Sequence, residues 1–136
     1  MIVLDTHVWL WWISNPENLS TSATKAISRA VDENGIVISS ISTWEIALLV
    51  DKGRLELTID VRDWVRKTES LPFVRFVPVD NTIILRSVTL PGQFHPDPAD
   101  RIITATAMTM GLPLVTRDNK IIDYPHVQTI WEENNQ

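Results

Sequence analysis

Short apolar runs alternate along the chain with longer stretches in which apolar residues return every three or four positions. The short runs predict strands that are buried on both faces, at residues 1–4, 36–38, 74–79, 114–116 and 127–130. The longer stretches predict helices at residues 8–13, 20–33, 42–52, 61–65, 80–88 and 98–110. Strands that alternate with helices are typical of a parallel sheet, so the pattern predicts an α/β fold.

Turn residues separate these elements. Asn15-Pro16, Asn34-Gly35 and Gly111 mark the ends of predicted helices, and residues 90–96 predict a loop. Pro78 places the strand at 74–79 at an edge of the sheet, because proline has no N–H to donate to a neighbouring strand. No repeat, low-complexity tract or linker interrupts the pattern, which predicts a single domain over residues 1–136.

Acidic residues stand where the predicted strands end. Asp5 follows the first strand, Asp118 follows the strand at 114–116, and Glu45 lies in the first turn of the helix after the second strand. Asp97 and Asp100 open the helix at 98–110. The carboxyl ends of parallel strands meet at one edge of the sheet, where ligands bind. We therefore expect these carboxylates to converge on one pocket.

Helix capping offers a simpler explanation for each acid taken alone. Asp97 before Pro98 is a typical N-cap, and Ser42 with Glu45 matches a capping box, as does Asp97 with Asp100. Asp5 and Asp118 could also cap the turns that follow them. Capping does not explain why every one of these sites carries a carboxylate, because Ser, Thr and Asn serve equally well. Several carboxylates in one pocket repel each other unless they are protonated or bridged by a cation.

The residue types limit which cation fits. The chain contains no cysteine, which excludes zinc–thiolate sites and disulfides, and its three histidines are scattered, with no partner apparent for His95 or His126. Oxygen ligands without cysteine or a converging histidine suit Mg²⁺ or Mn²⁺. Such ions bind phosphate oxygens and activate water. The pattern predicts a metal-dependent phosphodiester hydrolase.

The net charge of −5 argues against binding nucleic acid by bulk electrostatics, so such a role needs metal ions or a local basic patch. Three basic residues flank the acids, Arg101, Arg117 and Lys120. They either hold an RNA phosphate or neutralise the carboxylates as ion pairs. Among the six tryptophans, Trp44 and Trp64 are predicted to pack in the core because they share helical spacing with other apolar residues.

Three segments together resemble a known family. MIVLDTHVWLWW, SISTWEIALLVDKGRLEL and HPDPADRIITATAMTMGLPLVTRD look like the successive motifs of PIN-domain proteins, in particular VapC-type toxins of bacterial toxin–antitoxin pairs. The resemblance covers the chain from Met1 to about Ile130. It implies a three-layer α/β/α fold with a central parallel sheet of about five strands. It also implies an endoribonuclease that uses Mg²⁺ or Mn²⁺.

The resemblance assigns roles to individual residues. The acids that match the family's metal-holding and catalytic positions are Asp5, Glu45, Asp100 and Asp118. Asp97 belongs to a D-P-x-D-R variant of the third motif and is expected to act from further out, and Thr116 is expected to orient Asp118 or a water molecule. The family further implies an RNA substrate, a small VapB-type antitoxin that inhibits the toxin, and a homodimer.

Two other classes of function remain open at this point. The same fold could serve as a protein or RNA interaction module without nuclease activity, which the acidic charge and the capping roles favour. Asp5 could alternatively carry a phosphoryl group, although His7 stands where a phosphatase of this kind needs a second Asp. No basic leader precedes an apolar stretch and no apolar run approaches the ~20 residues that span a bilayer, so we expect a cytoplasmic protein without a membrane segment.

Overall fold

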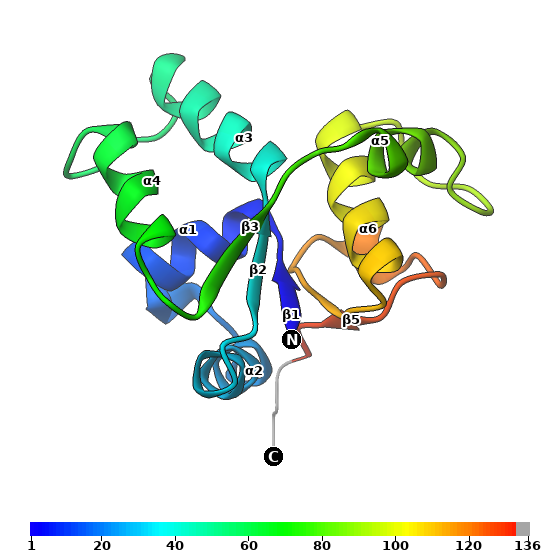
Figure 1. The fold of residues 1–136 in the computed structure, drawn as a ribbon, viewed down its shortest axis with the longest axis horizontal. Coiled ribbons are helices and arrows are strands. Elements are labelled where there is room, and N and C mark those ends of the chain that lie inside the picture. Colours follow the sequence, from blue (N-terminus) through cyan, green and yellow to red (C-terminus); the bar gives the residue numbers. More distant parts are fainter. Residues whose placement is uncertain (133–136) are drawn as a thin grey trace.

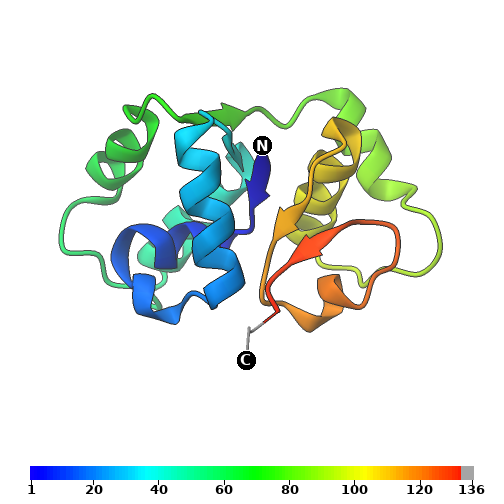
Figure 2. The same ribbon diagram turned by 90° about the horizontal axis from the view of Figure 1, so that it is seen from below.

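The structure, a computed structural model, describes residues 1–132 and shows a parallel sheet between two layers of helices (Figures 1 and 2). The strands are β1 (Ile2–Leu4), β2 (Ile36–Ser39), β3 (Val74–Val77), β4 (Leu114–Val115) and β5 (Thr129–Ile130). The helices are α1 (Thr6–Ser14), the 3₁₀ turn η1 (Pro16–Asn18), α2 (Thr21–Asp32), α3 (Ser40–Asp51), α4 (Val61–Glu69), α5 (Asn81–Val88), α6 (Pro98–Met110) and α7 (Asn119–Ile122). The predicted α/β fold is confirmed. Only η1 and α7 were not predicted as helices, because a single turn is too short to have a period.

The sheet has the strand order β3-β2-β1-β4-β5, and all its strands are parallel. β3 lies at one edge, as Pro78 predicts, and β5 lies at the other. β1 is central, and Leu4 is in register with Ile38 of β2 on one side and Val115 of β4 on the other. The chain order reverses at β1, so the carboxyl ends of β1 and β4 form the switch point where α/β sheets bind ligands.

The side chains of β1 alternate between two hydrophobic cores. Ile2 and Leu4 pack in one core with residues of α1, α2 and α4. Val3 packs in the other core with residues of α5 and α6. Figure 1 shows these two groups of helices on opposite sides of the sheet. The strands β1, β2 and β4 are buried on both faces, as predicted, whereas the edge strands β3 and β5 are only partly buried. Among residues 1–132, no helix combines the length and the apolar character needed to cross a membrane.

The start of α3 differs from the prediction. The helix begins at Ser40 and is capped by Ser39, whose hydroxyl accepts a hydrogen bond from the Ile41 N–H at 3.2 Å. Glu45 therefore lies in the second turn of the helix, and its expected capping box with Ser42 is wrong.

The prediction for Trp44 in the same helix is also wrong. Its side chain is 56% exposed, whereas Trp64 is 4% exposed and packs in the core as expected. Apolar residues surround α3 on nearly every side, so their spacing does not indicate which side faces the sheet. The structure buries Ile46 and leaves Trp44 at the surface.

Candidate active site

Asp5 lies directly after β1 and is 5% exposed. Its Oδ1 accepts a hydrogen bond from the Thr6 N–H at 2.8 Å, so it caps α1, and its Oδ2 accepts one from the Thr116 hydroxyl at 2.7 Å. The Thr116 hydroxyl in turn accepts the Asp118 N–H at 3.0 Å. Thr116 therefore connects the ends of the neighbouring strands β1 and β4 and fixes the positions of Asp5 and Asp118.

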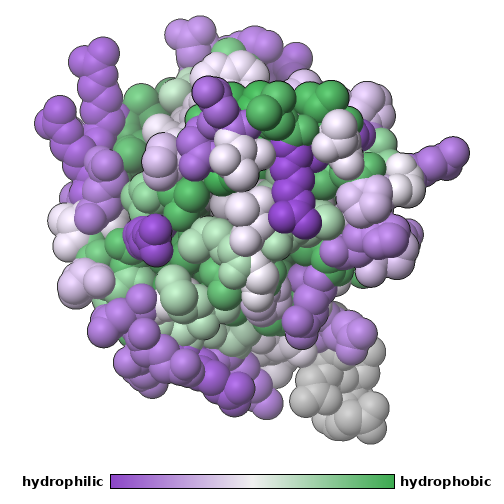
Figure 3. Space-filling model, turned by 45° about the vertical axis from the view of Figure 1, so that its right-hand side comes forward, coloured by the Kyte–Doolittle hydropathy of each residue, from purple (hydrophilic) through white to green (hydrophobic). Residues whose placement is uncertain are grey.

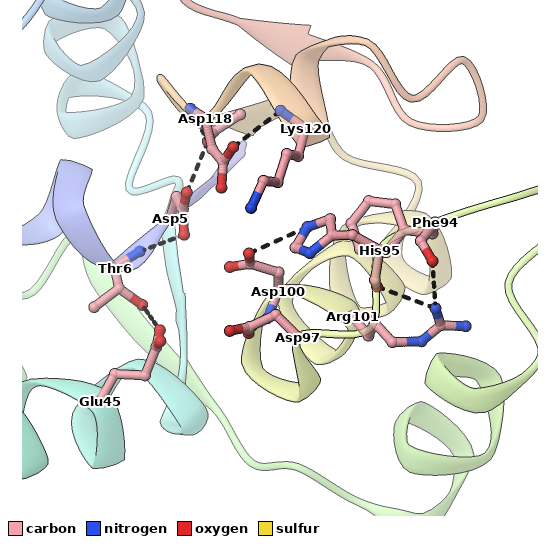
Figure 4. A network of polar contacts seen from close by, with 11 residues as sticks. Asp5, Thr6, Glu45, Phe94, His95, Asp97, Asp100, Arg101, Asp118 and Lys120 are labelled. Atoms are coloured by element: carbon pink, nitrogen blue, oxygen red, sulfur yellow. Dashed lines mark hydrogen bonds and ion pairs between the residues drawn. The ribbon is translucent and has the colours of Figure 1, made fainter.

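Glu45 reaches the same edge of the sheet from α3. Its carboxylate accepts a hydrogen bond from the hydroxyl of Thr6, which lies 2.8 Å from the Ser42 hydroxyl (Figure 4). Thr6 thus sits between Asp5, to which its N–H donates, and Glu45. Because Glu45 has no capping role, the simpler explanation for this acid no longer holds.

Two acids of α6 have different surroundings. Asp97 is exposed and caps α6, accepting the Asp100 N–H at 2.9 Å. Asp100 has a side chain that is only 18% exposed, and its Oδ2 lies 3.2 Å from Nε2 of His95. Figure 4 shows the Asp100 carboxylate in the space between Asp5, Asp118 and His95. Asp118 completes the group while capping α7 through the Lys120 N–H at 2.9 Å.

The acids at this edge of the sheet influence one another electrostatically. The pKa of Asp100 is raised to about 8, first by burial and then by the negative charges of four other acids, Asp5, Asp97, Asp118 and Glu45. Burial also raises the pKa of Asp5 and of Glu45, although hydrogen bonds from Thr116 and Thr6 act in the opposite direction. Acids that follow β1 and β4 and acids on α3 and α6 thus lie close enough to affect one another, as predicted.

These side chains fit a divalent cation. One oxygen each from Asp100 and Asp118 and one nitrogen from His95 lie within 4.8 Å of one another. Nε2 of His95 is buried and has no hydrogen-bond partner among residues 1–132, despite its closeness to Asp100. A cation placed among these groups would relieve the repulsion that raises the pKa of Asp100. Asp5, which lines the same cavity as Asp118, would supply a further oxygen.

The position of His95 beside the acids was not predicted from the sequence. The three histidines are scattered along the chain, and the expectation that none converges on the acids is wrong for His95. A signal existed in HPDPAD, where the histidine precedes Asp97 and Asp100 by two and five positions. The loop between α5 and α6 folds back on the start of α6, which brings the first residue of this motif beside the last.

The three basic residues occupy unlike positions. Arg117 is exposed and lines a cavity of about 460 Å³ together with Asp5 and Asp118. Lys120 is also exposed, and Figure 4 shows its side chain pointing into the space between Asp118 and Asp100. Neither forms an ion pair with an acid within residues 1–132. Both are therefore free to meet a negatively charged ligand at the rim of the site.

The position of Arg101 matches neither of the two roles expected for it, phosphate binding or ion pairing with the acids. Its guanidinium donates to the backbone carbonyls of Ser87, Phe94 and His95 at 2.8, 2.9 and 3.2 Å, with a longer contact to the Val88 carbonyl at 3.4 Å. It pairs with no acid in the described part of the chain and points away from the site (Figure 4). Arg101 therefore fastens the 89–97 loop to α6 and holds His95 in place.

Replacing this clamp should destabilise the protein. We expect Arg101→Lys to lower the free energy of unfolding by about 2 kcal/mol, because lysine keeps the charge but cannot serve several carbonyls at once. Urea unfolding followed by tryptophan fluorescence measures this loss. Arg86→Lys is the matched control, since Arg86 makes a single weak contact to Thr109 at 3.5 Å. Equal stability of both variants would contradict the clamp.

Comparison with known proteins identifies the family. The family model described as PIN domain matches residues 2–127. The chain belongs to the PIN-domain family. This PIN domain is 37% identical over 132 residues to Ribonuclease VapC22 of Mycobacterium tuberculosis, an alignment that covers 96% of this chain and 98% of the relative. That relationship places it among the VapC-type members of the family.

Solved structures with the same fold include partners of antitoxins. VapBC2 from Rickettsia felis, bound to a DNA fragment from its promoter, matches this PIN domain with a TM-score of 0.72 at 19% identity, over 97% of this chain and 100% of that chain. A toxin–antitoxin complex from Klebsiella pneumoniae matches with a TM-score of 0.63 at 22% identity, over 93% and 95% of the two chains. At these identities the likeness establishes the fold.

Proposed function

We propose that this PIN domain is a metal-dependent endoribonuclease and the toxin of a toxin–antitoxin pair. The observation that carries the proposal is the position of Asp100, whose side chain is 18% exposed and whose pKa is raised to about 8 by burial and then by the negative charges of four other acids. Capping explains Asp5, Asp97 and Asp118, but it explains neither Asp100 nor Glu45. The ribonuclease relative at 37% identity supports RNA as the substrate.

Asp5, Asp100 and Asp118 would hold the metal ion, with Glu45 contributing directly or through water. Mg²⁺ or Mn²⁺, when bound, supplies an activated water and neutralises charge on the scissile phosphate. Thr116 keeps Asp5 and Asp118 in place through its two hydrogen bonds, and Thr6 directs Glu45 toward them. Arg117 and Lys120 at the rim would bind phosphates on either side of the scissile bond.

Cleavage of a mixed pool of structured RNA tests this function. We expect purified protein to cut RNA in the presence of Mg²⁺ or Mn²⁺ and to stop when EDTA removes the metal. Absence of both cleavage and metal binding would instead support an interaction module of the same fold, which the capping roles of Asp5, Asp97 and Asp118 favour.

A groove between α3 and α4 is a candidate surface for the antitoxin. It has a volume of about 210 Å³ and is lined by apolar side chains and by charged ones of both signs, including Ala47, Val65, Arg66 and Glu69. Trp44 stands exposed on α3, from which Ala47 lines the groove. Exposed aromatic residues beside such grooves often dominate the free energy of binding.

We expect Trp44→Ala to weaken binding of the antitoxin by at least about tenfold. The stability of the toxin should hardly change, because the side chain is exposed. Calorimetric titration with the small protein encoded beside the toxin measures the affinity. Ile13→Ala on α1, which also removes an exposed apolar side chain, is the matched control. Equal affinity in the two variants would exclude Trp44 from the interface.

The homodimer, the single domain over residues 1–136 and the cytoplasmic location stay predictions. Helix α5 exposes three large apolar side chains, Ile84, Leu85 and Val88, that a second subunit could cover. The side of the molecule that carries α5 and α6 turns forward in Figure 3, which shows apolar surface among hydrophilic side chains. Light scattering of the purified protein decides between monomer and dimer.

A further inference from the structure

His95 is held rigidly at the acidic site although it lies in a loop. Arg101 donates to its backbone carbonyl, and its ring lies 4.5 Å from the ring of Phe94. Phe94 in turn packs edge-on against Tyr124, whose hydroxyl donates to the Pro91 carbonyl. The imidazole is therefore positioned by the same contacts that fix the loop, as is typical of groups that bind a ligand.

The nitrogen of this ring that faces the acids is left without a hydrogen bond. Nε2 is buried, and among residues 1–132 no donor or acceptor meets it in hydrogen-bond geometry. The Asp100 oxygen at 3.2 Å is close enough for an ion pair but is not aligned for a hydrogen bond. A buried polar atom without a partner costs free energy, so a ligand is expected to satisfy it.

The distances match the shell of a single ion. Nε2 of His95 and one oxygen each of Asp100 and Asp118 all lie within 4.8 Å of one another. Ligand atoms that each bind one ion at about 2.0–2.3 Å are separated by roughly 3–4.5 Å from each other. Figure 4 shows the three side chains around a common space, which the Asp5 carboxylate borders beside Asp118.

We propose that Nε2 of His95 is a ligand of the metal ion at this site, so that the site combines one nitrogen with carboxylate oxygens and prefers Mn²⁺ to Mg²⁺. This inference rests on the proposed function, because it concerns the same metal. Mg²⁺ strongly prefers oxygen ligands, whereas first-row transition metals also accept imidazole. The histidine thus distinguishes this site from one built of carboxylates alone.

A second role for His95 competes with this one. A protonated imidazole would pair with Asp100 and neutralise part of the acidic charge, without touching a metal. If His95 has that role, a variant without His95 carries more uncompensated negative charge in the pocket. That variant would bind both Mn²⁺ and Mg²⁺ more tightly. The two roles therefore predict opposite changes in metal affinity.

Electron spin-echo spectroscopy of Mn²⁺ bound to the purified protein separates the two roles. A directly bound imidazole nitrogen modulates the echo of Mn²⁺, and the modulation changes when the protein is labelled with ¹⁵N-histidine. We expect this nitrogen signal in the unmodified protein. It should disappear in His95→Gln and persist in His7→Gln and His126→Gln, the controls for the other two histidines. The labelling experiment needs no substitution, so its result remains valid even if one of the variants folds poorly.

Calorimetric titrations with MnCl₂ and MgCl₂ supply the second measurement. We expect His95→Gln to weaken Mn²⁺ binding by about tenfold and Mg²⁺ binding by much less. Mn²⁺ binding that needs Asp100 but gives no histidine signal would overturn the role of His95 and leave the proposed function intact. Tighter binding of both metals in His95→Gln would assign it the charge-neutralising role instead. Absence of any metal binding by the unmodified protein would overturn both proposals.

Discussion

Asp100→Asn is expected to reduce RNA cleavage by at least about a hundredfold, because the substitution removes a charged group from the centre of the metal site. The fold should remain intact. Asparagine has nearly the same shape, and the side chain of Asp100 has no role in capping α6, whose N-terminus is capped by Asp97. Initial rates of cleavage at saturating Mn²⁺ measure the loss, and circular dichroism reports the fold.

Asp97→Asn is the matched control for this experiment. It removes the same charge three positions away and keeps the cap, since asparagine caps helices as well as aspartate does. We expect it to retain most of the activity. Full cleavage by Asp100→Asn would remove Asp100 from the mechanism. Equal losses in both variants would show that only the total charge of the pocket matters.

The metal-free protein is expected to lose stability as the pH rises from 3.8 to about 8. The folded protein raises the pKa of Asp100 from 3.8 to about 8, so between these values the folded state binds a proton that the unfolded chain has released. The stabilisation that accompanies this proton is complete below pH 3.8 and disappears as the pH rises through about 8. The raised pKa values of Asp5 and Glu45 add to the effect in the same direction.

Thermal unfolding in EDTA at pH 5.5 and 8.5 measures this dependence. We expect the Tm to be lower at pH 8.5 by about 5 °C or more. Asp100→Asn should reduce the difference, because asparagine does not titrate. Saturating Mn²⁺ should raise the Tm more at pH 8.5 than at pH 5.5, since the metal binds ionised carboxylates. A Tm that is independent of pH, with or without Asp100, would contradict the convergence of the acids.

The sequence predicts the sheet well because the central strands β1, β2 and β4 are apolar on both faces and most of the helices keep their period. It predicts the position of Asp5 and Asp118 because Asp5 follows β1 directly and Asp118 stands three residues after the end of β4. It does not predict the start of α3, since Ser39, Ser40 and Ser42 can all cap a helix and only the structure selects Ser39. The exposure of Trp44 follows from the same difficulty, because a helix that is apolar on all sides gives no preferred face.

His95 illustrates a second limit. Its place beside Asp100 depends on the path of the 89–97 loop, and this path is set by carbonyl groups that meet Arg101 from α6. Backbone carbonyls are present at every residue and leave no mark in the sequence. An arginine that binds backbone carbonyls therefore looks, in the sequence, like an arginine that binds phosphate or carboxylate.

The bond between Asp5 and Thr116 joins residues that are 111 positions apart in the chain. During translation, Asp5 emerges early, but the strand that must lie beside β1 and carry Asp118 to it is among the last to be synthesised. A growing chain therefore lacks the complete acidic pocket for most of its synthesis. We expect the nascent protein to have no nuclease activity until β4 has been inserted into the sheet, so the ribosome that makes it is protected until then. An antitoxin therefore has time to bind surfaces that are synthesised earlier, such as α3 and α4.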